Sequence, residues 1–200
     1  ERLSYISRLY PGVAVTTDLG DVMKNPDIDA VAIATPVASH HGLASQALSA
    51  GKHTFVEKPL TRTVAEAEDL LTLAREHNLA LMVGHTFVYN SYVQAIKELI
   101  ESGDMGTVMY INARRLNLGL FQRDINVAWD LAPHDLSIIL YWLGRDPVAL
   151  NCQGEAHINP DIEDVTTITL QFDDDCVAFI QSSWIDPRKT REITVVGSRK

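Results

Sequence analysis

The chain has 200 residues, of which 46% are hydrophobic and 22% are charged, a composition that allows a buried core and argues against disorder. Its 17 basic and 26 acidic residues give a formal net charge of −9, and the scattered basic residues argue against a nucleic-acid partner or a membrane partner. Cys152 and Cys176 lack metal-ligand spacing, so we expect no metal site and a reducing, cytoplasmic location. No apolar stretch approaches the ~20 residues that span a bilayer.

The first part of the chain alternates between helix and strand patterns. Gly51 is placed to end a helix, and Thr63 with Glu66 three residues later is placed to cap the next one. Short apolar strands joined by helices are typical of a parallel sheet with crossover connections. The predicted helices are 2–9, 19–24, 39–49 and 64–77, and the predicted strands are 13–15, 29–36, 53–59 and 80–83.

The pattern changes after Gly84, where longer strands follow one another with turn sequences between them. These strands predict a mostly antiparallel sheet. The simplest division is therefore into two unlike domains, 1–86 and 87–200. The predicted helices are 89–102 and 130–143, and the predicted strands are 107–116, 148–157, 166–172, 177–184 and 192–196, with an irregular stretch from 117 to 127.

Polar residues follow two of the parallel strands at the edge where α/β sheets bind ligands. Thr35-Pro36 precedes Ser39-His40, where the free N–H groups of a starting helix favour a polar ligand, although this motif taken alone favours an ordinary turn with an N-cap. Glu57-Lys58-Pro59 delivers a cation to the same edge, and a cis Lys58–Pro59 bond would re-aim the lysine. A charged strand end is the alternative for this tripeptide.

Asp130 and His134 are four residues apart and share a face if the helix runs through Pro133. With both at the N-terminal end of the helix, the dipole lowers the proton affinity of the histidine and the carboxylate raises it. A balance near neutrality suits a group that transfers protons. The alternative is a capping aspartate with a buried histidine bonded to backbone.

These motifs together resemble the Gfo/Idh/MocA oxidoreductase family over essentially the whole chain. They are EKP at 57–59, IATP at 33–36 with His40 following, and DxxxHD at 130–135 before an apolar helix and Leu-Gly. The resemblance implies an α/β chain: an incomplete Rossmann parallel sheet, then an α+β domain with a mostly antiparallel open sheet. Such proteins bind NAD or NADP in the first domain and place the substrate against the open sheet of the second.

The resemblance also implies roles for single residues. Lys58 would contact the nicotinamide ribose and a substrate hydroxyl, Asp130 would hold a sugar hydroxyl or orient the site, and His134 would take the hydroxyl proton as hydride leaves the same carbon. The lysine and the imidazole must then converge on one carbinol. NAD is favoured over NADP. The implied catalytic residues are Lys58, Asp130 and His134, and the implied cofactor-binding residues are Thr35, Pro36, His40, Glu57, Lys58 and Pro59.

Segments 84–90 and 114–135 are similar to members that act on nucleotide-linked sugars, particularly those of the UDP-N-acetylglucosamine 3-dehydrogenase type. Arginines there, including Arg114, offer forked donors for phosphate or carboxylate, and neutral polar residues offer sugar contacts. For any one arginine, a solvated strand or loop position is the alternative. The predicted substrate-binding residues are His85, Tyr89, Arg115, Asn117, Arg123 and Asn126.

Three other functions are compatible with these residues. One is a glycosidase that uses NAD for transient oxidation, the second is a non-catalytic sensor of sugar nucleotides, and the third is a packed fragment whose polar residues are caps and strand ends. The expected small-molecule partner is a sugar or UDP-sugar. An open sheet exposes an apolar face, so we also expect a homodimer or homotetramer.

The family's opening strand and its GxGxxG turn are not among these 200 residues, and its sheet normally continues past Lys200. That turn supplies the cradle for the pyrophosphate. We therefore expect a polypeptide with only these residues to bind NAD poorly. Isothermal titration calorimetry checks this, and an affinity in the micromolar range would contradict it.

Overall fold

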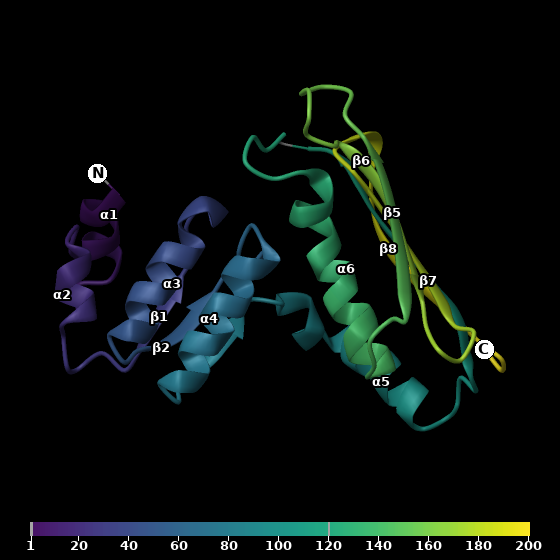
Figure 1. Ribbon diagram of the computed structural model, residues 1–200, viewed down its shortest axis with the longest axis horizontal. Helices are drawn as coiled ribbons and strands as arrows, with labels where there is room; N and C mark the ends of the chain where they lie inside the picture. The colour runs from purple at the N-terminus through teal and green to yellow at the C-terminus, as the bar shows by residue number, and fades with distance from the viewer. Residues whose placement is uncertain (1, 120) are drawn as a thin grey trace. The chain divides into compact units, whose positions relative to one another are not determined.

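The structure is a computed structural model that describes residues 2–119 and 121–200 (Figure 1). Glu1, which the first predicted domain includes, and Leu120, in the predicted irregular stretch, lie outside the described residues. The chain divides into two compact units between Val83 and Gly84. Within the described ranges, every helix is too short or too polar to cross a bilayer.

The first unit contains sheet A, whose strands are all parallel and lie in the order β1-β2-β3. Because parallel neighbours cannot be joined by a tight turn, a helix connects each strand to the next. This confirms the predicted parallel sheet. The elements are α1 (Arg2–Leu9), α2 (Leu19–Met23), β1 (Ala30–Ile33), a 3-10 turn (Val37–Ser39), α3 (His40–Ser49), β2 (His53–Val56), α4 (Val64–Glu76) and β3 (Leu81–Val83).

Alternate residues of sheet A form its core with α3 and α4. Ile33 pairs in register with Val56, and both are buried. They pack against Ala44 and Leu48 of α3 and against Leu70 of α4. Because the last residues of β1 and β2 are paired, the segments that follow them leave the sheet side by side.

The predicted strand at 13–15 is wrong. Val13 lies in a bend and Val15 in irregular backbone, and their exposed fractions are 54% and 40%. A strand needs a neighbour to complete its ladder of hydrogen bonds, and in the described part of the chain neither valine is paired in a sheet. Alternating valines alone were therefore an insufficient signal.

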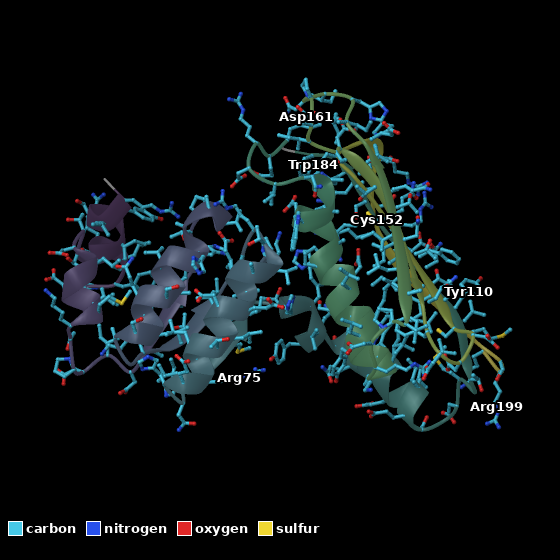
Figure 2. The ribbon with its side chains drawn as sticks, viewed as in Figure 1. Arg75, Tyr110, Cys152, Asp161, Trp184 and Arg199 are labelled. Atoms are coloured by element: carbon cyan, nitrogen blue, oxygen red, sulfur yellow. The ribbon has the colours of Figure 1, made fainter. Side chains whose placement is uncertain are left out.

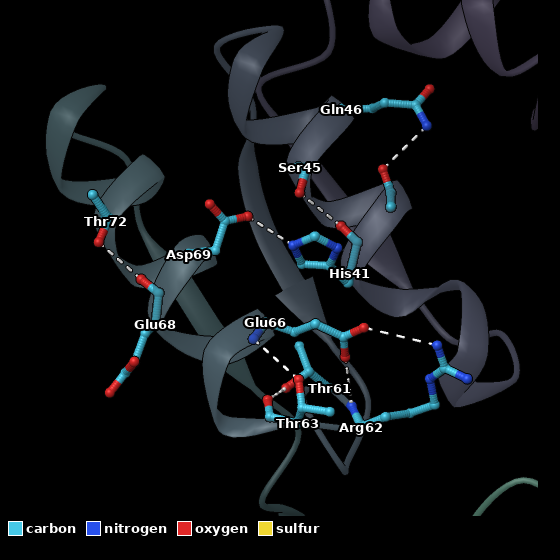
Figure 3. Close-up of polar contacts among 11 residues, drawn as sticks. His41, Ser45, Gln46, Thr61, Arg62, Thr63, Glu66, Glu68, Asp69 and Thr72 are labelled. Carbon is cyan, nitrogen blue, oxygen red and sulfur yellow. Dashed lines mark hydrogen bonds and ion pairs between the residues drawn. The ribbon is translucent and has the colours of Figure 1, made fainter.

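The predicted start and stop of two helices are confirmed. Gly51, just after α3, has a φ of +76°, a left-handed conformation that glycine adopts without strain. At the start of α4, the hydroxyl of Thr63 accepts a hydrogen bond from the Glu66 N–H at 3.2 Å (Figure 3). The Glu66 carboxylate accepts from the Arg62 N–H at 3.0 Å, so it closes the loop before the cap rather than the cap itself.

The second unit contains sheet B, with the order β5-β6-β7-β4-β8. The β4–β7 pair is parallel and the other three pairs are antiparallel, which confirms a mostly antiparallel sheet. The elements are a 3-10 turn (Thr86–Tyr89), α5 (Ser91–Glu101), β4 (Val108–Leu118), α6 (Val127–Leu143), β5 (Ala149–Glu155), β6 (Val165–Gln171), β7 (Val177–Ser183) and β8 (Ile185–Gly197).

Helix α6 lies lengthwise along one face of sheet B (Figure 1). Its buried residues Ile138 and Ile139 share a core with Ile111 of β4 and Ile180 of β7. The buried indole of Trp142 donates to the Val93 carbonyl at 2.8 Å and so joins α6 to α5. This packing holds the N-terminal half of α6, which carries the predicted site residues, at a fixed place on the sheet.

Two predicted boundaries in this unit are wrong. Helix α6 begins at Val127 instead of Asp130, because the Asn126 side chain accepts the Trp129 N–H at 3.1 Å and caps the helix there. Strand β8 begins at Ile185 instead of residue 192. It contains Pro187, which an edge strand such as β8 tolerates because one side of it lacks a ladder.

Replacing the N-cap of α4 should loosen the start of that helix. Thr63→Ala removes the acceptor of the Glu66 N–H, a loss of about 1 kcal/mol, so exchange of the first-turn amides of α4 should accelerate about fivefold. Thr72→Ala on the same helix is the control, because its hydroxyl bonds only to the Glu68 carbonyl and alanine favours the helix (Figure 3). Hydrogen–deuterium exchange measures both. Equal rates in the two variants would show that Thr63 does not cap α4.

Candidate active site

The carboxyl edge of sheet A brings the predicted cofactor-binding residues together. The Glu57 N–H donates to the Ile33 carbonyl at 2.9 Å, so the segment after β2 starts directly beside the segment after β1. Thr35 and Pro36 are exposed, whereas Glu57 and Lys58 are half-buried. The Lys58–Pro59 peptide bond is cis. Hydroxyl, carboxylate and ammonium groups therefore meet at the edge where a parallel sheet binds its ligands.

His40 joins these two segments through its ring. Its exposed fraction is 1%, with Nδ1 2.9 Å from the Pro59 carbonyl oxygen and Nε2 2.8 Å from that of Thr35. Each ring nitrogen of His40 thus lies within hydrogen-bond distance of a carbonyl oxygen from one of the two loops. The ring thus ties the two loops to each other, and its predicted contact with a cofactor stays a prediction.

The hydroxyls of Thr35 and Ser39 lie 2.7 Å apart, and the Ser39 hydroxyl donates to the Pro36 carbonyl at 2.8 Å. A serine has one hydroxyl hydrogen, so the Thr35 hydroxyl is the donor to Ser39. The Ser39 side chain forms no capping hydrogen bond to α3. Thr35 keeps its acceptor lone pairs at the edge of the sheet.

In the second unit, Asp130 lies in the first turn of α6 and His134 follows one turn later. The helix runs without a break through Pro133, which meets the condition for these two residues to share a face. Because α6 starts earlier than predicted, His134 lies beyond the first turn of the helix. The helix dipole acts most strongly within that first turn. The dipole is therefore weaker at His134 than predicted, and the balance between dipole and carboxylate stays a prediction. The carboxylate of Asp130 accepts the indole N–H of Trp184 at 3.1 Å.

An aromatic ring connects His134 with a buried cation. The ring centroids of Phe87 and His134 are 4.8 Å apart, with an interplanar angle of 72°. The guanidinium carbon of Arg115 lies 4.7 Å from the Phe87 centroid. Such edge-on and cation–π contacts restrict the ring orientations of their partners. Phe87 thus contributes to holding the imidazole.

Arg115 forms a buried, two-pronged ion pair with Asp135, the residue after His134. Its Nη2 and Nε lie 2.6 and 3.1 Å from the two carboxylate oxygens, and the exposed fractions of the two residues are 6% and 1%. Burial raises the pKa of Asp135, and the bonds and charge of Arg115 offset part of that increase. The forked donor that we predicted for a substrate therefore holds a carboxylate of this chain, and its role toward a substrate stays a prediction.

The other predicted substrate residues occupy varied positions in the second unit. Burial lowers the pKa of His85, and its Nδ1 has no hydrogen-bond partner among the residues that the structure describes. Tyr89 is 69% exposed and Arg123 is exposed, whereas Asn117 is half-buried on β4. Asn126 caps α6 and also donates to the Glu163 carboxylate at 2.8 Å. A sugar-binding role for these residues stays a prediction.

The structure thus assembles two groups of predicted residues. One lies at the carboxyl edge of sheet A in the first unit, and the other is Asp130 with His134 on α6 in the second. The convergence of the two groups on one carbinol stays a prediction. Sequence reasoning missed Trp184 and Phe87, and it treated Asp135 as part of the helix pattern without its partner.

Comparison with known proteins decides the family. Residues 6–85 match a model described as "Oxidoreductase family, NAD-binding Rossmann fold", and residues 93–200 match the "GFO/IDH/MocA C-terminal domain". The chain belongs to the Gfo/Idh/MocA oxidoreductase family. The resemblance drawn from EKP and DxxxHD is confirmed, as is the α/β fold that it implied.

Family members with named activities include sugar-nucleotide enzymes. The chain is 30% identical over 179 residues to the uncharacterized oxidoreductase YrbE of Bacillus subtilis (84% of this chain, 52% of that protein). It is 31% identical over 170 residues to the UDP-N-acetylglucosamine 3-dehydrogenase of Acidithiobacillus ferrooxidans (84% and 53%). The solved structure of GnnA, the dehydrogenase of that name from the same organism, has a TM-score of 0.83 at 27% identity (98% and 63%). The chain spans about half the length of the curated relatives it matches.

Breaking the buried ion pair should destabilise the second unit strongly. Arg115→Met leaves the Asp135 carboxylate buried without its partner, which should lower the free energy of unfolding by about 3–5 kcal/mol at neutral pH. The double variant Arg115→Met/Asp135→Leu should recover most of that loss, because no charge then remains buried. Urea titration followed by tryptophan fluorescence measures this, since all three tryptophans, Trp129, Trp142 and Trp184, lie in the second unit.

The loss of stability caused by Arg115→Met should also depend on pH. Without the cation, burial raises the pKa of Asp135 further, so the folded state binds more protons than the unfolded state. Stability then falls as pH rises from the unfolded pKa towards the folded one, and the deficit is smaller at pH 5 than at pH 8. The matched control is Arg145→Met, a half-exposed arginine paired with Asp174, which should cost at most about 1 kcal/mol. A deficit equal to the control's would contradict the role of the ion pair.

Proposed function

We propose that the full-length protein is an NAD(P)-dependent dehydrogenase that transfers hydride between a sugar or nucleotide-sugar hydroxyl and nicotinamide, with NAD the favoured cofactor. The proposal rests on one observation. Both family models match this chain in order, and Lys58, Asp130 and His134 stand at the family's motif positions. The description of the first model as NAD-binding supports the cofactor. We expect the protein to act in the cytoplasm, where free cysteines such as Cys152 and Cys176 persist.

The donor set at the carboxyl edge of sheet A fits the ribose and nicotinamide end of a dinucleotide. Thr35 offers hydroxyl lone pairs to a ribose hydroxyl or a carboxamide N–H, and the Lys58 ammonium offers donors to ribose oxygens. The His40 bridge between the two loops keeps these groups at the same edge. When bound, nicotinamide supplies the acceptor or donor of the hydride.

The protein's own residues then handle the hydroxyl proton. Oxidation of a carbinol to a carbonyl removes one hydride from the carbon and one proton from the oxygen. In our proposal His134 accepts that proton as a general base, Asp130 orients the sugar by accepting from a neighbouring hydroxyl, and Lys58 stabilises the developing negative charge on the oxygen. Reduction of the carbonyl runs through the same groups in reverse.

A nucleotide-linked sugar is the substrate class that the predicted contacts favour. One of the relatives is named for UDP-N-acetylglucosamine. Two exposed arginines of the second unit, Arg114 and Arg123, suit a diphosphate. A guanidinium can donate two parallel hydrogen bonds to phosphate oxygens. Polar residues without charge suit the sugar hydroxyls. The proposed sugar contacts are His85, Tyr89, Asn117 and Asn126, while Arg115 is engaged in its ion pair with Asp135.

We also propose that two copies associate through the face of sheet B opposite α6. Tyr110 of β4 and Phe179 of β7 alternate with core residues along their strands, so they point away from α6, and their exposed fractions are 40% and 39%. Aromatic rings on adjacent strands form an apolar surface that soluble proteins commonly cover. Multi-angle light scattering of the full-length protein distinguishes dimer from tetramer.

The test is a panel of UDP-sugars and free sugars with NAD or NADP, followed by the absorbance of reduced nicotinamide. His134→Asn should lower kcat by about 100-fold or more, because it removes the proton acceptor, while binding of NAD stays unchanged. His77→Asn, an exposed histidine at the end of α4, is the matched control. Sugar release without net reduction would indicate a glycosidase. Binding of UDP-sugar without turnover would indicate a sensor, and full activity of His134→Asn would refute its role as base.

A further inference from the structure

We propose that Trp184 is a residue that positions Asp130 for the reaction. This inference rests on the proposed function, in which Asp130 belongs to the reacting site. Trp184 lies at the junction of β7 and β8, 54 positions after Asp130 (Figure 2). Its indole Nε1 is 3.1 Å from Oδ2 of Asp130, and an indole N–H can only donate.

Trp184 is itself held in place on every side. Its exposed fraction is 1%. Its backbone N–H donates to the Asp164 carbonyl at 2.9 Å, and its backbone carbonyl accepts from the Gly119 N–H at 2.8 Å. The ring of Phe121 meets the indole edge-on, with centroids 6.2 Å apart and an interplanar angle of 84°. A donor with so little freedom imposes its direction on the acceptor.

The start of α6 and Trp184 are both hydrogen-bonded to the same short segment, Glu163-Asp164. The Val127 N–H donates to the Glu163 carbonyl at 2.9 Å, and the Asn126 amide donates to the Glu163 carboxylate at 2.8 Å. Glu163 therefore holds the helix that carries Asp130, and its neighbour Asp164 holds Trp184. Both ends of the Asp130–Trp184 hydrogen bond are thus fixed by two consecutive residues.

That segment is ordered by a buried carboxylate. Asp164 is 1% exposed, and its carboxylate accepts from the N–H groups of His157 and Ile158 at 2.7 and 2.8 Å, with the His157 Nδ1 at 2.7 Å. Burial alone would raise the pKa of Asp164, but these bonds outweigh it and the pKa lies below its usual value. These hydrogen bonds hold the two ends of the turn 157–164 together.

The chemical consequence concerns the orientation of the Asp130 carboxylate. A carboxylate rotates easily about its last bond, because that torsion has a broad minimum. A directional N–H on Oδ2 fixes the rotation and so fixes where the second oxygen points. For a group that orients a sugar hydroxyl one turn away from His134, a defined direction lowers the cost of reaching the reactive geometry.

The first test is Trp184→Phe in the full-length protein. Phenylalanine keeps the aromatic packing and removes the N–H. The value of kcat should therefore fall about tenfold, with little change in the KM for the nicotinamide cofactor. Trp142→Phe is the matched control, because Trp142 is equally buried on α6 and also loses one indole bond, to the Val93 carbonyl. Urea titrations should show similar losses of stability in the two variants. Equal kcat values in the two variants would overturn the positioning role.

The second test is a double-mutant cycle with Asp130→Ala, at enzyme concentrations that make its residual rate measurable. If Trp184 acts through Asp130, adding Trp184→Phe to Asp130→Ala should change kcat by less than about twofold. A further tenfold loss would mean that Trp184 acts by another route and would overturn the inference. If Asp130→Ala alone keeps full activity, the proposed function of Asp130 fails instead, so the two failures are distinguishable.

Discussion

Packing of α6 along one face of sheet B is the constraint on which the second unit depends. The apolar residues of the helix, among them Ile138 and Ile139, are buried against β4, β6 and β7. That burial leaves little freedom for rotation or sliding of the helix, since each buried aliphatic side chain contributes about 1.5–3 kcal/mol. The polar residues near its start then project in directions that the core has already chosen. Asp130 and His134 share a face because the helix is continuous, and this packing sets where that face points.

In the first unit, the register between β1 and β2 plays the corresponding part. Ile33 and Val56 end their strands at the same level, so two loops that are far apart in sequence start as neighbours. His40 then ties them together through backbone carbonyls, which are present whatever side chains the loops carry. The carboxyl edge of sheet A is thus shaped first by backbone geometry, and Thr35 and Lys58 then add their side chains to it.

What the sequence could predict was mainly local or periodic. The cap at Thr63, the stop at Gly51 and the parallel order of sheet A follow from short-range patterns, and the family motifs located Lys58, Asp130 and His134. The sequence misses the early start of α6 because its cap, Asn126, lies inside the predicted irregular stretch and is predicted to bind substrate. The Arg115–Asp135 pair and the Trp184–Asp130 bond join positions 20 and 54 apart. No spacing rule brings such residues together, because only the folded sheet does.

The ion pair beside His134 shows how one helix serves stability and chemistry at once. Consecutive helical residues point about 100° apart, so Asp135 enters the core while His134 stays half-buried on a neighbouring face. The Arg115 guanidinium donates to both oxygens of the Asp135 carboxylate, and this two-pronged geometry favours one alignment of α6 on β4. Phe87 contacts both Arg115 and His134, so the register chosen by the ion pair reaches the imidazole through one ring. The pair therefore connects the stability of the core with the placement of the imidazole.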